Sequence, residues 1–271
     1  KYPNFKMYRG DLANLSFTQK VLSENKIDKI CHLAAQAGVR YSITHPHAYV
    51  QSNLVAFVNL LEEAKNNQIK DFVYASSSSV YGSNEKIPYS INDNVDHPIS
   101  LYAATKKSNE VLAHSYHHLF QMNCTGLRFF TVYGPFGRPD MAYFSFTKDI
   151  TEGKTIKVFN DGHHQRDFTF VDDIVIGILA ALDKAYPYEI FNLGNNKPVE
   201  LGYFIQIIEK ELGVEAKKEY LPMQPGDVLA TYADIEYTKE KLGYEPKTSI
   251  EEGLNKFITW YKQYYHEKFV K

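Results

Sequence analysis

Short apolar runs alternate with longer helix-like segments along the first two thirds of the chain. Strands separated by helices of about ten residues or more form βαβ units, in which the strands are parallel and the crossovers are right-handed. The sequence therefore predicts an α/β fold built on a parallel sheet. Strand-like runs occupy residues 5–12, 29–35, 71–77 and 124–134, and helical patterns occupy residues 15–25, 45–68 and 101–121.

The predicted sheet has polar or small residues at the carboxyl end of each strand. In parallel α/β sheets, ligands bind at this edge. We therefore expect one crevice to be lined by the four segments that leave the strands, which are residues 10–11, 34–36, 76–79 and 130–131.

After Pro135 the pattern becomes less regular. Short strand-like runs and helices lie between loops that contain glycine and proline. The sequence therefore predicts two domains. Residues 1–134 form a larger, sheet-based domain, and residues 135–271 form mainly a smaller mixed α/β lobe, with some segments returning to the larger domain.

Charge and composition exclude several classes of protein. A formal net charge of −2 gives no basic surface for nucleic acid, and no apolar run approaches the length that spans a membrane. Cys31 and Cys124 lie in apolar runs and are predicted to be buried free thiols, as is usual in a reducing cytoplasm. The histidine pairs of the chain lack the partners of a metal site. We therefore expect a cytoplasmic protein with no metal and no nucleic-acid or membrane partner.

Tyr102 and Lys106 are four residues apart in the predicted helix at residues 101–121. At this spacing both side chains lie on one helix face, one turn apart. An ammonium group beside a phenol favours the phenolate, so the pKa of the tyrosine falls toward neutrality and the residue can act as a general acid or base. The pair alone is a weak signal, because tyrosine and lysine often meet at this spacing by chance.

Four consecutive serines, Ser76–Ser79, follow the apolar run at residues 71–75 and precede Val80-Tyr81-Gly82. By itself a serine run is usually a polar exit from a strand. Here it stands about twenty-five residues before the Tyr-Lys pair. This combination is much more specific than either part, and it indicates a catalytic constellation.

Six stretches of the chain resemble the extended short-chain dehydrogenase/reductase family of nucleotide-sugar epimerases and dehydratases, and within it they are most similar to UDP-glucuronate 4-epimerases. The resemblance covers essentially the whole chain, and it implies a Rossmann-type, doubly wound parallel sheet that lacks its first strands. The stretches are LAAQAGVRYS (33–42), YASSSSVYG (74–82), YAATKKSNE (102–110), RFFTVYGPFGRPDMA (128–142), RDFTFVDDI (166–174) and PMQPGDV (222–228).

The resemblance implies an NAD-dependent 4-epimerisation of a UDP-hexuronic acid, UDP-glucuronate to UDP-galacturonate, through a 4-keto intermediate, as a step of polysaccharide biosynthesis. Tyr102 would take the proton of the sugar 4-hydroxyl, and Ser77 would bond the 4-oxygen. Lys106 would lower the pKa of Tyr102 and hold the nicotinamide ribose. Ser78 and Ser79 stand where the 4,6-dehydratases of the family carry Asp-Glu, so the serines favour simple epimerisation.

The resemblance also implies the binding residues. For NAD these are Asp11 near the adenine, Leu33, Ala34 and Ala35 beneath the dinucleotide, Asn53 beside it, and Ser76, Tyr102 and Lys106. For the UDP-sugar they are Ser78, then Thr131 and Arg138 in a carboxylate pocket, and Arg166, Gln224 and Asp227 for the diphosphate and uridine.

A homodimer through an intermolecular four-helix bundle is expected. The helices predicted at residues 45–68 and 101–121 resemble those that form such a bundle in the family. They also carry more apolar residues than one face of a surface helix needs. These residues are Leu54, Val55, Phe57, Val58, Leu60, Leu61, Val111, Leu112, Leu119 and Phe120.

Two alternatives remain open. One is a UDP-galactose or UDP-N-acetylhexosamine 4-epimerase, and the other is a non-catalytic scaffold protein of the same fold, against which the presence of Ser77, Tyr102 and Lys106 argues. The family begins with a strand and a glycine-rich turn that have no counterpart before Asp11. We therefore expect the 271-residue chain, expressed alone, to epimerise no UDP-sugar.

Overall fold

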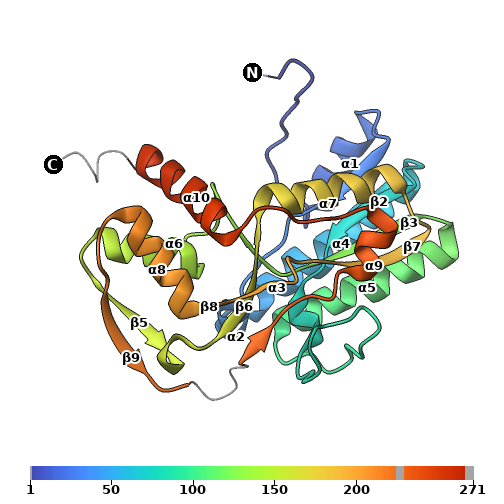
Figure 1. Ribbon diagram of the computed structural model, residues 1–271. Helices are drawn as coiled ribbons and strands as arrows, with labels where there is room; N and C mark the ends of the chain where they lie inside the picture. Colours follow the sequence, from blue (N-terminus) through green and yellow to red (C-terminus); the bar gives the residue numbers. More distant parts are fainter. Residues whose placement is uncertain (1, 224–228, 266–271) are drawn as a thin grey trace. The chain divides into compact units, whose positions relative to one another are not determined.

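The computed structural model describes residues 2–223 and 229–265 (Figure 1). The chain divides into two compact units. The first comprises Lys1–Glu85, Ile91–Arg128 and Ile178–Phe191, and the second comprises Lys86–Ser90, Phe129–Gly177 and Asn192–Lys271. The domain boundary after residue 134, expected from the sequence, stays a prediction.

A four-stranded sheet forms the centre of the first unit. Its strand order is β1 (Lys29–His32), β2 (Asp71–Ala75), β3 (Asn123–Phe129) and β7 (Tyr188–Leu193). β1 pairs with β2 and β2 pairs with β3, both in parallel, with His32 opposite Tyr74 and Ala75 opposite Leu127. The predicted parallel α/β sheet is confirmed, and the carboxyl ends of β1 and β2 lie at the same edge.

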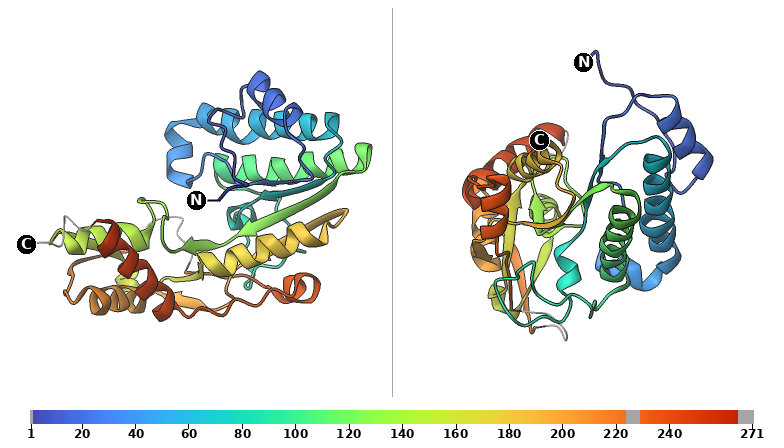
Figure 2. Two further views of the ribbon diagram at one scale, coloured as in Figure 1. Left: turned by 90° about the horizontal axis from the view of Figure 1, so that it is seen from above. Right: turned by 90° about the vertical axis from the view of Figure 1, so that its right-hand side faces the viewer.

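Helices cover both faces of this sheet (Figure 2). α4 (Ala56–Asn66) and α5 (Leu101–Phe120) lie on one face, and the carboxyl-terminal part of α7 (Val171–Lys184) lies on the other. No helix in the described ranges is long and apolar enough to span a membrane. The core beneath α4 and α5 includes Ile30, Phe57, Leu60, Leu61, Ala64, Phe72, Tyr74, Ala113 and Cys124.

The helix predicted at residues 45–68 forms with one irregularity. It consists of α3 (Pro46–Tyr49), a π-helical segment at Val50–Val55, and α4. Pro46 stands at the start of α3, where its lack of an N–H leaves no hydrogen bond unmade. The wider π turn changes the direction of the side chains that follow, and Asn53 within it is buried.

Two shorter helices complete this unit. α1 (Leu15–Ser23) forms where the sequence predicts a helix, and its first turn is capped by the Asn14 side chain, which accepts a hydrogen bond from the Phe17 N–H at 3.1 Å. α2 (Val39–Thr44) was not predicted. Its six residues are too few to show an amphipathic period in the sequence.

Two expectations for the first unit are wrong. Residues 5–12 form no strand, and Phe5 is 71% exposed. A strand needs a hydrogen-bonding neighbour, and no described strand pairs with this segment. Cys31 is exposed rather than buried, because β1 alternates and buries only Ile30 and His32 on its covered face.

In the described part of the second unit, short strands form two small sheets. β6 (Gln165–Phe170) pairs in parallel with β4 (Thr131–Tyr133) and β10 (Ala230–Thr231) and antiparallel with β8 (Pro198–Glu200), and β5 (Thr155–Phe159) pairs in parallel with β9 (Lys217–Leu221). The helices are α6 (Ala142–Thr151), α8 (Leu201–Leu212), α9 (Glu236–Leu242) and α10 (Ile250–Tyr264). The core that these elements enclose is rich in aromatic rings, among them Tyr133, Phe144, Phe168, Phe204 and Phe257.

A buried carboxylate joins the loops of the second unit to β6. Asp167 is 1% exposed and accepts hydrogen bonds from the backbone N–H groups of Asn195, Asn196 and Ala233, at 2.6, 3.1 and 3.0 Å. The Thr169 hydroxyl donates to it as well, at 3.2 Å. These bonds satisfy backbone donors that short strands leave unpaired, so the loops that carry Asn195, Asn196 and Ala233 are held against β6.

We predict that protonation of His32 destabilises the first unit at low pH. The imidazole is 5% exposed and packs against the Phe57 ring at a centroid distance of 5.6 Å. Burial, together with the charge of Lys106, lowers the pKa of His32 from 6.5 to about 4. Between these values the unfolded chain binds a proton that the folded chain does not. Stability is therefore lost as the pH falls through this window, by about 3 kcal/mol.

Urea unfolding of the wild type and of His32→Leu, each at about pH 7 and about pH 4, measures this effect. Leucine cannot take up a proton, so the variant should lose about 3 kcal/mol less than the wild type on acidification. Equal losses in the two proteins would show that His32 is not the source of the acid sensitivity.

Candidate active site

The serine run continues β2 and then forms one turn of 3₁₀ helix, Ser78–Tyr81. Ser77 caps that turn: its hydroxyl oxygen accepts a hydrogen bond from the Ser79 N–H at 3.1 Å. Gly82 ends the turn with a φ of +57°, and a Cβ at this position would lie 2.1 Å from the His97 carbonyl oxygen. The segment therefore reverses sharply at the carboxyl end of β2, with Ser77 buried at its start.

α5 carries the predicted Tyr-Lys pair. The helix begins after Ser100, whose hydroxyl caps its first turn, and Tyr102 lies within that turn. Lys106, one turn later, is 3% exposed and donates from Nζ to the Ala75 carbonyl oxygen at 2.7 Å. Burial lowers the pKa of Lys106 to about 8. The helix is thus bonded to the end of β2, two residues before Ser77.

Asn53 joins the loop after β1 to α5. Its Oδ1 accepts a hydrogen bond from the Gln36 N–H at 2.8 Å, and its Nδ2 donates to the Gln36 carbonyl and to the Thr105 hydroxyl, both at 3.0 Å. The Asn109 side chain donates to the Asn53 carbonyl oxygen at 2.7 Å. The oxygen and the nitrogen of the Asn53 amide are therefore both used to hold the loop. A contact between Asn53 and NAD stays a proposal.

The other residues expected to bind NAD lie on the surface of the first unit. Leu33, Ala34 and Ala35 follow β1 and are exposed. Asp11 is exposed as well, and its Oδ1 accepts a hydrogen bond from the Ala13 N–H at 2.9 Å. None of the described residues before Asp11 forms a strand, so Asp11 does not stand at a strand end, contrary to the prediction from the sequence. Residues 33–35 do follow a strand.

Two predicted carboxylate-pocket residues belong to the second unit. Thr131 is half-buried at the start of β4, and Arg138 is exposed in the loop that precedes α6. Arg138 forms a bidentate ion pair with Asp140, from Nε to Oδ1 at 3.0 Å and from Nη2 to Oδ2 at 2.5 Å. Hydrogen bonding to Arg138 holds the pKa of Asp140 below its usual value. The guanidinium fork is therefore already engaged by a carboxylate.

Arg166 is half-buried in β6 and donates from Nη1 to the Gln165 carbonyl oxygen at 2.8 Å. The remaining predicted substrate residues, Gln224 and Asp227, lie outside the described residues. The structure therefore places one of the three side chains that the sequence analysis associates with the diphosphate and uridine.

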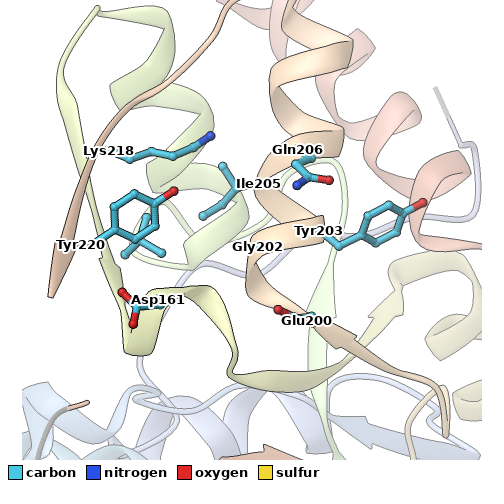
Figure 3. Close-up of a pocket in the computed structure, with 9 residues that line it drawn as sticks. Asp161, Glu200, Gly202, Tyr203, Ile205, Gln206, Lys218 and Tyr220 are labelled. Carbon is cyan, nitrogen blue, oxygen red and sulfur yellow. The ribbon is translucent and has the colours of Figure 1, made fainter. Parts of the chain in front are cut away.

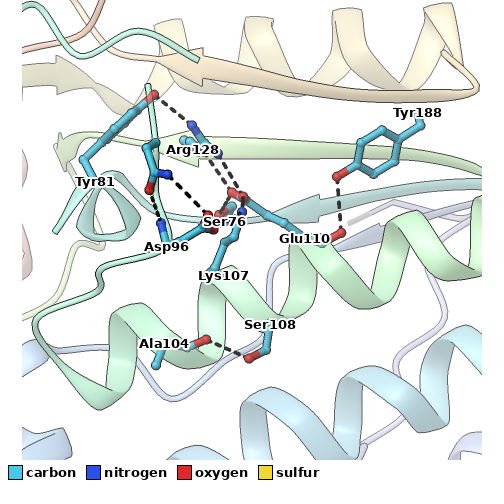
Figure 4. A network of polar contacts seen from close by, with 10 residues as sticks. Ser76, Tyr81, Asp96, Ala104, Lys107, Ser108, Glu110, Arg128 and Tyr188 are labelled. Carbon is cyan, nitrogen blue, oxygen red and sulfur yellow. Dashed lines mark hydrogen bonds and ion pairs between the residues drawn. The ribbon is translucent and has the colours of Figure 1, made fainter. Parts of the chain in front are cut away.

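A buried ion pair beside the serine run was not predicted from the sequence (Figure 4). Glu110 of α5 and Arg128 of β3 are 2% and 3% exposed, and the guanidinium Nε and Nη2 each lie 2.9 Å from one carboxylate oxygen. Arg128 also donates to the Tyr81 hydroxyl at 3.1 Å, and the Ser76 hydroxyl donates to Glu110 at 2.7 Å. Two sequence signals point to this pair: Glu110 stands one turn after Lys106, and Arg128 interrupts an apolar run.

A separate hollow of about 280 Å³ lies in the second unit (Figure 3). Two of its charged side chains are already paired, since Lys218 contacts Glu209 at 2.7 Å and Glu200 contacts His163 at 2.9 Å. No residue proposed for the site lines it, and the described residues contain no cluster suited to a metal ion. The lining residues are Val158, Asp161, Glu200, Gly202, Tyr203, Ile205, Gln206, Lys218 and Tyr220.

The parallel sheet, the serine at the end of β2 and the Tyr102–Lys106 pair on α5 together define a Rossmann-type protein of the short-chain dehydrogenase/reductase class. The chain belongs to the NAD-dependent epimerase/dehydratase family, whose pattern matches residues 1–194.

Similar proteins are known by sequence and by structure. The chain is 55% identical over 260 residues to an uncharacterised protein of Methanocaldococcus jannaschii, covering 96% of this chain and 80% of that protein. It is 48% identical over 274 residues to UDP-glucuronate 4-epimerase 4 of Arabidopsis thaliana, covering 94% of this chain and 63% of the relative. The crystal structure of UDP-glucuronic acid 4-epimerase from Bacillus cereus, in complex with UDP-glucuronic acid and NAD, is 37% identical with a TM-score of 0.90, covering 97% of this chain and 83% of that one.

Proposed function

We propose that this protein catalyses the NAD-dependent 4-epimerisation of UDP-glucuronate to UDP-galacturonate. The observation that carries the proposal is the hydrogen bond from Lys106 Nζ to the Ala75 carbonyl oxygen, at 2.7 Å. It attaches the helix that bears Tyr102 to the strand end that continues into Ser77. Relatives named UDP-glucuronate 4-epimerase, at 48% identity, support the choice of substrate.

Three side chains of the first unit have separate roles in the proton transfer. Tyr102 takes the proton of the sugar 4-hydroxyl as a general base and later returns it as a general acid. Ser77 bonds the 4-oxygen and keeps it oriented. Lys106, with a pKa of about 8, is protonated at neutral pH, so that its charge favours the phenolate of Tyr102.

The first unit also offers groups that fit a nicotinamide cofactor. A lysine ammonium has three donors, and among the described residues Lys106 uses one of them, on Ala75. The others are available for the hydroxyls of the nicotinamide ribose. When bound, NAD⁺ would supply an acceptor for the hydride of sugar C4 and a donor of the same hydride to the opposite face. We assign the rest of the cofactor to Asp11, Leu33, Ala34, Ala35, Asn53, Ser76 and Tyr102.

Arg138 is proposed to bind the uronate carboxylate. Its Nε and Nη2 face the Asp140 carboxylate in the planar, bidentate arrangement that a uronate would require. Binding would therefore replace the Asp140 carboxylate by the uronate carboxylate, and the guanidinium would keep its arrangement. The other substrate contacts that we propose are Ser78 and Thr131 near the sugar and Arg166, Gln224 and Asp227 near the diphosphate and uridine.

The experiment that tests this function incubates the full-length protein with UDP-glucuronate, UDP-glucose and UDP-N-acetylglucosamine and identifies the products by NMR. We expect UDP-galacturonate to form fastest. Arg138→Gln should lower kcat/KM for UDP-glucuronate by about 10- to 100-fold, because a hydrogen-bonded charge pair is lost. Asp140→Asn, which removes only the competing carboxylate, should not lower it.

Preference for a neutral UDP-hexose would reassign the protein to the UDP-galactose or UDP-N-acetylhexosamine 4-epimerases. An Arg138→Gln variant with unchanged kcat/KM would remove Arg138 from the carboxylate pocket. No conversion of any UDP-sugar would favour a non-catalytic protein of the same fold.

Ser77→Ala is expected to reduce turnover of UDP-glucuronate more than Ser78→Ala or Ser79→Ala. Ser77 is buried at the strand end, whereas the other two hydroxyls belong to the following 3₁₀ turn. The loss of kcat should be about 10²-fold or more for Ser77. If Ser79→Ala proved the most damaging of the three, the register of the catalytic serine would be wrong by two positions.

A cytoplasmic homodimer remains part of the proposal. Phe57, Leu60 and Leu61 lie in the core of the first unit, so their apolar character needs no partner chain. On α5, Val111 and Leu119 are 55% and 66% exposed, which supports an apolar face for a second copy. Light scattering at micromolar concentration should give the mass of a dimer, and a monomer would contradict this.

A further inference from the structure

We infer that Glu110 is a positioning residue that sets the place of Ser77 relative to Tyr102 and Lys106. This inference rests on the proposed function, and it deepens the account of the same site. Glu110 is not among the residues expected to touch substrate or cofactor. Its side chain is instead directed at the segment that carries the serine (Figure 4).

Two hydrogen bonds attach one helix to one strand end. Lys106 donates to the Ala75 carbonyl oxygen at 2.7 Å, and Glu110, one turn later, accepts from the Ser76 hydroxyl at 2.7 Å. Both side chains are at least 97% buried. Two consecutive residues that precede Ser77 are therefore bonded to the helix that bears Tyr102.

The far end of the serine segment is held by Arg128. Arg128 forms a bidentate pair with Glu110 and donates to the Tyr81 hydroxyl at 3.1 Å, with its guanidinium 4.9 Å from the Tyr81 ring centroid. Burial alone would lower the pKa of Arg128, but the Glu110 carboxylate outweighs it and the pKa is raised. The guanidinium therefore stays charged and holds Tyr81, the last residue of the 3₁₀ turn.

The consequence is that Glu110 reaches both ends of residues 76–81, directly at Ser76 and through Arg128 at Tyr81. Ser77 lies between these two points, and its own hydroxyl caps the turn that they enclose. A displacement of about 1 Å at a reacting group can cost about 10²-fold in rate. The network therefore acts on the chemical step, while the proposed contacts to the diphosphate and uridine of the substrate, at Arg166, Gln224 and Asp227, lie outside it.

Steady-state kinetics of the full-length protein with UDP-glucuronate test this role. Glu110→Gln keeps the size of the side chain but loses the bidentate pair. We expect kcat to fall by about 10- to 100-fold while KM stays within about twofold, because a group that acts in the transition state is displaced. Tyr81→Phe removes one hydrogen bond and no charge, so it folds even if Glu110→Gln does not. It should lower kcat by about 3- to 10-fold.

Tyr116→Phe is the matched control. The Tyr116 hydroxyl, also on α5, donates to Glu62 Oε2 at 2.9 Å, so the same substitution breaks a comparable bond away from the serine segment. It should lower the melting temperature as much as Tyr81→Phe does and leave kcat unchanged. If Tyr81→Phe keeps the wild-type kcat, as the control should, or if it changes KM and kcat together, the positioning role is wrong. A wild type that forms no UDP-galacturonate contradicts the proposed function itself and this inference with it.

Discussion

Tyr102→Phe is expected to lower kcat for UDP-glucuronate by about 10²–10⁴-fold, the range typical of a lost general acid–base group. The substitution removes the phenolic oxygen and keeps the ring, which packs edge-on against Tyr49 at a centroid distance of 6.0 Å. The fold and the capped first turn of α5 should therefore be preserved. Initial rates measured by NMR, together with circular dichroism of both proteins, give the comparison.

Tyr116→Phe serves again as the control, because it also removes one hydroxyl from α5 but lies far along the helix from the Tyr-Lys pair. Its turnover should equal that of the wild type. If Tyr102→Phe keeps more than about a tenth of the wild-type kcat, the general acid–base role belongs to another group.

Arg128→Met is expected to have the largest effect on stability, a loss of about 3–5 kcal/mol in the free energy of unfolding. The substitution leaves the Glu110 carboxylate buried without its bidentate partner. Surface ion pairs such as Lys256–Glu252, whose side chains are 47% and 56% exposed, contribute far less because water screens them. Urea unfolding followed by circular dichroism measures the loss.

The double variant Arg128→Met/Glu110→Gln provides the control for this prediction. It leaves no unpaired charge, and glutamine can still accept from Ser76, so it should be more stable than Arg128→Met alone. If the two variants are equally unstable, the loss reflects packing of the arginine side chain and not the buried charge.

The central strands of the first unit could be predicted because each forms one apolar run. β2 and β3 are buried on both faces along most of their length, so each carries a single charged residue and the boundaries are visible. Residues 5–12 show that a local pattern alone does not determine a strand. Their alternation resembles a strand, but pairing depends on a neighbour that a local pattern cannot supply. The prediction that Cys31 is buried was wrong for a related reason, since no local sequence pattern shows that only one face of β1 is covered.

The second unit was predicted less completely because its strands are short and pair over long sequence distances. β10 has two residues, and its partner β6 lies more than sixty positions earlier. At such lengths the period of two cannot be recognised, and pairing is decided by buried anchors such as Asp167. Helices could be expected after Pro135 because an amphipathic pattern, such as those of α7, α8 and α10, is local.

In the candidate site too, the sequence predicts residues that form local motifs and misses contacts between distant elements. Tyr102, Lys106 and Ser77 could be proposed because spacing on one helix and a short motif are properties of the sequence. Glu110 and Arg128 could not be paired, because their contact joins α5 to β3 and depends on how the helix lies on the sheet. A charged residue inside an apolar run is the signal that could have directed attention to Arg128.

The most direct test of the central claim is the fate of a deuterium label at C4 of UDP-glucuronate. The full-length protein, with its bound cofactor, is incubated with the labelled substrate in ordinary water, and the product is examined by NMR. The proposed chemistry removes a hydride from C4 and returns the same hydride to the opposite face. UDP-galacturonate should therefore form with the deuterium retained at C4. Formation of UDP-galacturonate that has lost the label to water, or no formation of UDP-galacturonate, would contradict the account.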